Sequence, residues 1–218
     1  MIRRRHLAMG LALGLVLSLC GSALEWKATR LAVATAPFQQ TQDVTFEFAN
    51  RGASAVTIRD VQTSCDCLEA TLARKTYQPG EAGAIQARFT VGDRIGIYER
   101  VITVVTDEPG DPIRLHLQIE VPAAAVLVPR TVSWTKGEVG AEKLIALTAA
   151  PGLLIDFSTA SPTNDAFAVR LETLEPGRAY RLRISARDTK QPASAAIRVF
   201  GRERSGHDLV ISAYSTVE

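Results

Sequence analysis

The chain has 218 residues, of which 46% are hydrophobic and 22% charged, and its formal net charge is +2 at pH 7. Removing residues 1–23 would lower Lys+Arg from 25 to 22 against 23 Asp+Glu, which leaves a net charge of −1. Such a balance provides no basic surface for neutralising phosphates, and no block of like charges indicates an interaction tail. We therefore expect no nucleic-acid partner.

The first residues have the pattern of a secretory signal peptide. Three arginines at positions 3–5 precede an apolar run from Leu7 to Leu19, and the small residues Gly21, Ser22 and Ala23 follow. The run is shorter than the roughly 20 residues that a membrane-spanning helix needs, and the later sequence contains no transmembrane candidate. We predict cleavage after Ala23 and an exported protein, periplasmic or extracellular.

Two alternatives to this processing stay open. Cys20 follows Leu17 and Ser18, so it is a candidate for the acylated cysteine of a lipoprotein, although Leu19 stands where that processing prefers a small residue. An uncleaved N-terminal anchor is the second alternative, and the absence of a long apolar continuation argues against it.

The dominant pattern after the leader has a period of two. Apolar and polar residues alternate over 113–121, 44–48 and 85–89, as expected for half-buried strands, because successive strand side chains point to opposite faces. The sequence predicts seven short strands in the first half, at 31–33, 44–48, 56–61, 68–72, 85–89, 101–106 and 113–121. Turn clusters at 50–52, 79–81 and 107–112 separate several of them. This number of strands in about 100 residues indicates an immunoglobulin-like sandwich.

The second half continues the same style after a short connection. Residues 123–129 are small and apolar and lie between Pro122 and Pro129, which predicts a stiff hinge that could also begin the next domain. Further strands are predicted at 132–134, 144–147, 167–171, 180–186, 195–200 and 209–216. The fold class is therefore all-β, with two immunoglobulin-like antiparallel β-sandwich domains, 24–122 and a smaller one at 130–218, after an N-terminal signal helix at 1–23. A single continuous sandwich is the alternative.

Three fragments resemble a known family. Residues 46–52 read FEFANRG, residues 64–67 read SCDC, and residues 79–83 read PGEAG. Their order and spacing are similar to the bacterial secreted family called domain of unknown function 1573, over about residues 24–122. The resemblance implies an immunoglobulin-like sandwich related to ciliary and centrosomal ASH/Hydin domains, an envelope location, and no established activity. The family pattern has glycine where this chain has Asp66, which puts any backbone geometry that needs glycine in doubt.

Cys65 and Cys67 are the chemically distinctive pair. On a regular strand they would project from one face about 6.5 Å apart. A disulfide needs Cβ atoms roughly 3.5–4.5 Å apart, so a bridge would require a tight turn at Asp66. Three interpretations stay open: two small buried residues that only pack, a labile disulfide, or a pair of thiols that binds Cu(I) or exchanges disulfides. The carboxylates of Asp60, Asp66 and Glu69 would disfavour thiolates and so argue against reactive thiols.

Other metal, catalytic and carboxylate sites have little support. His116 and His207 are the only histidines after the leader, and neither pairs with the cysteines in a zinc pattern or with a nucleophile in a triad. The acidic residues Asp107, Glu108 and Asp111 lie in a Pro/Gly turn, where a solvated loop is a better interpretation than a calcium site. We predict no catalytic residue.

Two further groups have ordinary interpretations beside functional ones. Trp26 and Trp134 are expected in the core or at a domain junction rather than as ligand platforms. A set of arginines could form a basic strip for an anionic envelope polymer or lipid headgroup, although a plain solvated face is the simpler interpretation. Its members are Arg170, Arg181, Arg183, Arg187 and Arg198.

The sequence leads to two hypotheses for function. The first is an exported, non-catalytic envelope protein that binds an unknown protein partner through sheet edges or loops, as sandwich edges offer unpaired backbone groups. The second is a periplasmic thiol-based copper-binding or redox protein centred on Cys65 and Cys67. Copper is the one cofactor that the sequence suggests.

Overall fold

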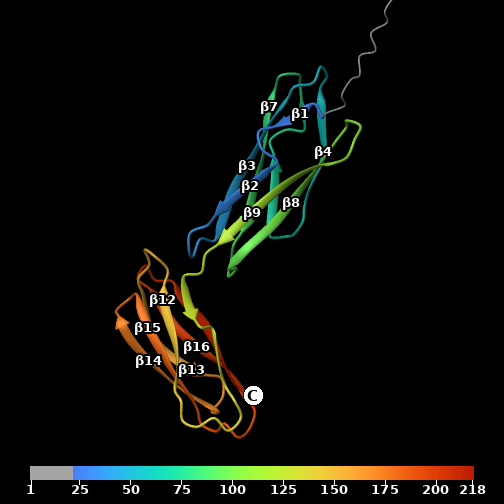
Figure 1. Ribbon diagram of the computed structural model, residues 1–218. Helices are drawn as coiled ribbons and strands as arrows, with labels where there is room; N and C mark the ends of the chain where they lie inside the picture. The colour runs from blue at the N-terminus through green and yellow to red at the C-terminus, as the bar shows by residue number, and fades with distance from the viewer. Residues whose placement is uncertain (1–21) are drawn as a thin grey trace, which may run out of the picture.

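The computed structural model describes residues 22–218, and every regular element in that range is a β-strand (Figure 1). No helix in it is long and apolar enough to cross a membrane. The predicted signal helix and Cys20 lie outside the described residues. The strands of the first half are β1 (Leu24–Trp26), β2 (Arg30–Ala34), β3 (Thr41–Asn50), β4 (Val56–Thr63), β5 (Leu68–Leu72), β6 (Thr76–Tyr77), β7 (Ala82–Thr90), β8 (Gly96–Thr106) and β9 (Ile113–Val121).

These strands form two facing sheets. One has the order β1-β3-β7-β5 and the other the order β2-β9-β8-β4-β6. The alternation along β9 explains the packing, because its residues at 115, 117 and 119 are buried while Arg114, Gln118 and Glu120 are exposed. Buried side chains from both sheets form a single core that includes Phe46, Ile85, Phe89, Ile102 and Leu115. Each such side chain contributes about 1.5–3 kcal/mol by leaving water.

The second half builds the same arrangement with its own core. Its strands are β10 (Ala125–Val128), β11 (Thr131–Trp134), β12 (Lys143–Ala149), β13 (Ile155–Pro162), β14 (Phe167–Glu175), β15 (Ala179–Ala186), β16 (Ala193–Glu203) and β17 (Asp208–Val217). The sheet orders are β10-β12-β15-β14 and β11-β17-β16-β13, and a separate apolar cluster lies between these two sheets.

The all-β prediction is confirmed, and two details differ from it. All seven strands predicted for the first half are present as β2–β5 and β7–β9. The sheets are not wholly antiparallel, because β2 pairs with β9 and β11 pairs with β17 in parallel register. Parallel pairing needs a long connection between the two strands, and in both pairs the partner strands are far apart in sequence. β10 occupies most of the predicted hinge at 123–129, while the domain boundaries themselves stay a prediction.

The strands that the sequence did not predict are short or irregular. β1 and β6 have three and two residues, too few for a visible alternation. β13 carries a register shift between Phe157 and Thr159, which interrupts its period of two.

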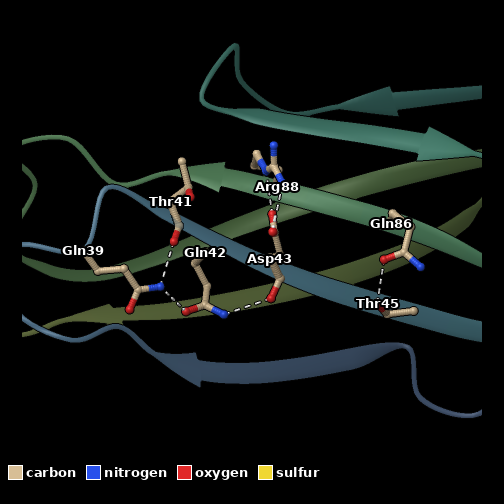
Figure 2. A network of polar contacts seen from close by, with 7 residues as sticks. All are labelled: Gln39, Thr41, Gln42, Asp43, Thr45, Gln86 and Arg88. Atoms are coloured by element: carbon tan, nitrogen blue, oxygen red, sulfur yellow. Dashed lines mark hydrogen bonds and ion pairs between the residues drawn. The ribbon is translucent and has the colours of Figure 1, made fainter.

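Polar pairs on the outer face fix the register of β3 against β7. Asp43 lies opposite Arg88, and the guanidinium donates two hydrogen bonds to the carboxylate, at 2.7 and 3.0 Å (Figure 2). The hydroxyl of Thr45 donates to Gln86 at 2.7 Å one cross-strand pair further on. These groups are solvent-exposed, so they add little free energy but penalise a slip of the strands.

The family-like fragments at 46–52 and 79–83 have structural roles. The buried amide of Asn50 donates to the carbonyls of Ser54 and Tyr77, at 2.8 and 2.9 Å, and accepts from the Gly52 N–H at 2.9 Å. A Cβ at Gly83 would overlap the rings of Tyr77 and Phe48. These residues therefore hold the turn region and the core in place, which accounts for the motif without any chemistry.

The two halves touch through an aromatic stack. The ring of Phe38 lies on the ring of His207, with centroids 4.8 Å apart and planes 9° apart. Phe38 has a φ of 64°, the one positive value at a non-glycine residue in the described part of the chain. A phenylalanine reaches this conformation at a cost, so the surrounding contacts must stabilise it.

We expect Asn50→Ala to lower the free energy of unfolding by about 2–4 kcal/mol, because it leaves the buried Tyr77 carbonyl, the partly buried Ser54 carbonyl and the Gly52 N–H without their partner. Chemical denaturation of the full chain measures this change. Gln42→Ala, at a partly exposed amide on the same strand, is the control and should have a far smaller effect. Equal losses in both variants would contradict the structural role given to Asn50.

Candidate functional site

The Cys65–Cys67 segment lies in a loop that crosses from one sheet to the other. Residues 64–67 connect β4 in one sheet with β5 in the facing sheet. The Leu68 N–H donates to the Cys65 carbonyl at 3.2 Å, which closes a turn around Asp66. Asp66 is exposed, whereas both cysteines are half-buried against the edge of the core. The loop therefore presents its sulfurs close to solvent at an end of the sandwich.

Cys65 and Cys67 are joined by a disulfide bond. The turn brings their Cα atoms to 5.2 Å, closer than a regular strand would place them. This is the geometry for which the sequence required a turn at Asp66. Asp66 does not need a positive φ, because Phe38 is the one non-glycine residue with such a value among residues 22–218. The replacement of the family's glycine by Asp66 is therefore accommodated without backbone strain.

The bridge contributes little to the stability of the fold, because the two cysteines are close together in the sequence. It joins residues only two apart. In the chain-entropy description, closing a loop of this size contributes about 1.6 kcal/mol, against about 3 kcal/mol for a loop of fifteen residues. Hydrogen bonds already hold the loop: the Ser64 N–H donates to the Val101 carbonyl at 3.0 Å, and the Thr90 N–H donates to the Cys67 carbonyl at 2.9 Å. The loop conformation therefore depends little on the bridge.

Arg100 on β8 is the residue that sequence reasoning missed. Its Nε lies 3.3 Å from the Sγ of Cys67. The guanidinium is fixed by donation from Nη1 to the Glu99 carbonyl at 2.7 Å, and it lies over the ring of Tyr98 at 5.3 Å. A usable signal existed, because the period of two that buries Ile102 also puts Arg100 on the core side of its strand. A charged residue at such a position calls for a partner.

Two of the three carboxylates that the sequence placed near the cysteines, Asp60 and Glu69, have other partners. Asp60 accepts a hydrogen bond from Gln62 at 2.7 Å, and Glu69 lies opposite Arg88 on the neighbouring strand. The charged group that donates a hydrogen bond to a cysteine sulfur is the guanidinium of Arg100, at Cys67. Its positive charge opposes the effect that Asp66 and its neighbours would have on a thiolate there.

The structure adds no support for a metal centre. In residues 22–218, no group of three or more His, Cys, Asp or Glu side chains could hold a metal ion. His116 lies on β9, whereas His207 belongs to the second half of the chain and stacks on the ring of Phe38. The copper hypothesis requires two free thiolates at Cys65 and Cys67, which the bonded sulfurs do not offer.

The predicted basic strip is divided between two sheets, and two of its arginines form ion pairs. Arg198 lies on β16, in the sheet opposite to the one that carries Arg181 and Arg183. Glu172 accepts a hydrogen bond from Arg183 at 2.7 Å and lies 3.9 Å from Arg181, and Arg183 also contacts Glu142 at 3.3 Å. The hydrogen bond from Arg183 is the main reason why the pKa of Glu172 lies below its ordinary value. Arg181 and Arg183 therefore belong to an ion-pair network with Glu172 and Glu142.

The remaining candidates have structural roles. Asp107 accepts the Thr57 N–H at 2.8 Å, which lowers the pKa of its carboxyl. Glu108 accepts hydrogen bonds from the Ser22 hydroxyl and the Ala23 N–H, at 3.1 and 3.0 Å. Trp134 is buried in the second core, and the half-buried Trp26 packs against Phe48. The predicted cleavage position at Ala23 thus lies beside the first sandwich.

We expect Glu172→Gln to lower the melting temperature near neutral pH and to have no effect at acidic pH. Because the folded-state pKa of Glu172 is depressed from 4.5, its ionised form adds stability above that value, and this stability is lost as the pH falls through the folded pKa. Melting temperatures of both proteins between pH 2.5 and 7 measure the difference. Glu175→Gln, at a more exposed pair with Arg178, is the control. A constant difference across the range would contradict the assignment.

Several solved structures are similar at low identity. The YadV chaperone matches 89% of this chain over 99% of its own length, with 11% identity and a TM-score of 0.37. The ASH/PapD-like domain 7 of human CEP192 matches 55% of this chain over 99% of its own, with 12% identity and a TM-score of 0.39. The match with the VesB protease of Vibrio cholerae covers 46% of this chain and 32% of the protease, with 14% identity and a TM-score of 0.38. No curated protein matches the chain.

A family comparison agrees with the fragments described above. The model of the family described as a protein of unknown function, DUF1573, matches residues 24–121. The match begins at β1 and ends at the last residue of β9, so it covers both sheets of the first half. The first half of this chain, residues 24–121, therefore matches the DUF1573 family.

Proposed function

We propose that this chain is an exported, non-catalytic binding module of the cell envelope, built as two immunoglobulin-like sandwiches. Its partner is a protein whose extended segment adds to the free edge of β10. The observation that carries this proposal is the composition of that edge strand. The leader pattern of the first residues supports export, and we propose the periplasm as the compartment.

β10 is an unusual edge strand. It pairs with β12 on one side only, so its other side offers unpaired N–H and C=O groups. Its four residues, 125–128, are all apolar. Each of the other edge strands described, β1, β2, β5, β6, β11, β13 and β14, carries at least one polar side chain. Soluble proteins commonly protect such edges with charges, and β10 has none.

The side chains of β10 indicate the chemistry of the segment that would bind. Val126 and Val128 are 50% and 62% exposed, and Leu144 on the adjacent strand is 45% exposed. Strand addition gains affinity from main-chain hydrogen bonds and selectivity from alternate side chains. A partner segment with apolar residues at alternate positions would cover both valines. Pro122 and Pro129 flank the strand and limit the addition to a short segment.

A photo-crosslinking residue at position 128 should trap a defined protein partner in intact cells, because the partner strand lies along β10. The matched control is the same residue at position 200. Phe200 is 38% exposed and lies on β16, where its backbone pairs with Thr159 of β13 on one side and with Val210 of β17 on the other. The adduct at 128 should disappear in a chain that also carries Val126→Lys, while the melting temperature is retained. Identical adducts from both positions, or an adduct insensitive to Val126→Lys, would overturn the edge-binding proposal.

We expect the protein isolated from the envelope to lack the arginines at positions 3–5, and the predicted N-terminus is Leu24. Intact-mass measurement of the native protein reads this directly. A mass that begins at an acylated Cys20 would mark a lipid anchor. A mass that includes Met1 in the major species would contradict export by cleavage, and it would leave the β10 proposal to be judged by the crosslinks.

A further inference from the structure

We propose that the Cys65–Cys67 bridge exchanges disulfides with a protein dithiol, with Cys65 as the sulfur that is attacked and Cys67 as the sulfur that leaves. The observation behind this assignment is the contact between Arg100 Nε and Cys67 Sγ, at 3.3 Å. This inference is independent of the edge-binding function, because the loop and β10 belong to different halves of the chain.

Arg100 makes the two sulfurs chemically unequal. A guanidinium beside a sulfur stabilises the thiolate, and a better-stabilised thiolate leaves a disulfide faster. The cation contacts Cys67, and no such contact is found for Cys65 among the described residues. An incoming thiolate therefore reacts most readily at Cys65, from which Cys67 is expelled towards Arg100.

The surroundings keep the cation in place when the bridge opens. Arg100 is held by the Glu99 carbonyl and by the faces of Tyr98 and Phe89. None of these contacts involves a sulfur. A residue that is positioned before the bond breaks needs no rearrangement to stabilise the developing charge.

The loop can pass between both redox states without unfolding. Its backbone hydrogen bonds run to Val101 and Thr90 on neighbouring strands, so they persist when the sulfurs separate. The bridge also spans too few residues to act mainly as a staple. Both cysteines are half-buried beside the exposed Asp66, which leaves the sulfurs within reach of a flexible partner segment.

The reaction balances with a protein dithiol as the reductant. One partner thiolate attacks the Sγ of Cys65, the Cys65–Cys67 bond breaks, and Cys67 leaves as a thiolate beside Arg100. The second partner thiolate then attacks the partner sulfur of the mixed disulfide, and Cys65 leaves as a thiolate. The partner is oxidised to a disulfide, and Cys65 and Cys67 are reduced to thiols after taking up the two protons that the partner released.

The first experiment measures how fast reduced glutathione opens the bridge in the full exported protein, and where it attaches. We expect the mixed disulfide at Cys65, identified by mass spectrometry of the acid-quenched reaction. We also expect Arg100→Gln to slow the opening about tenfold, and Arg100→Lys to recover most of the rate because it retains the charge.

Arg94→Gln is the matched control. Arg94 also lies 5.8 Å over the ring of Phe89 and is half-buried, but its hydrogen bonds go to the carbonyls of Thr90 and Val91. It should leave the rate unchanged. Melting temperatures of all variants separate a loss of fold from a loss of reactivity, and the Cys65→Ser/Cys67→Ser protein should retain its fold.

Three results would overturn the proposal: glutathione attached mainly at Cys67, an opening rate unaffected by Arg100→Gln in a folded protein, or a bridge that stays closed in excess dithiothreitol. None of these depends on the crosslinks at position 128, so the two proposals fail separately.

Discussion

Burial of one face of every sheet against the face of another is the constraint on which this structure depends. A strand with a period of two has one apolar face, and that face is stable only when a second sheet covers it. Each half meets this requirement with two sheets and one core. The same solution leaves open edges at the ends of each sheet, because only a closed barrel removes them. β10 is such an open edge. Its outward-facing side carries the exposed valines, and one row of its backbone groups has no partner strand.

The sandwich also dictates where irregular backbone can carry chemistry. A chain that passes from one sheet to the other must leave the regular ladder, and the segment between β4 and β5 does so over four residues, 64–67. A turn is needed there for topological reasons alone. The disulfide uses that turn, and the hydrogen bonds of the crossing supply the stability that the bridge does not. The loop is thus a rigid support for two sulfurs near solvent.

The sequence was most informative where the period of two was long. It placed β9 with its correct bounds, because nine residues of alternation leave little ambiguity, and it located β3, β4, β5, β7 and β8. It could not give β13, whose bulge breaks the alternation, or the parallel pairing of β2 with β9, which depends on contacts between residues about 85 positions apart. Pairing is a property of the folded chain, and neither partner strand encodes it by itself.

The candidate site shows the same division. Cys65 and Cys67 were visible because both chemistry-bearing residues are neighbours in sequence, and the condition for their bridge, a turn at Asp66, followed from strand geometry alone. Arg100 is 33 positions from Cys67 and reaches it only because β8 and the crossing loop meet. The sequence nonetheless predicts that Arg100 lies on the core-facing side of β8, because Arg100 stands two residues before Ile102 in the same strand. A half-buried cation needs hydrogen-bond acceptors to replace its lost hydration, and Arg100 finds the Glu99 carbonyl at 2.7 Å and the Cys67 sulfur at 3.3 Å. The alternation that buries Ile102 in the core therefore also places Arg100 against the Cys65–Cys67 bridge.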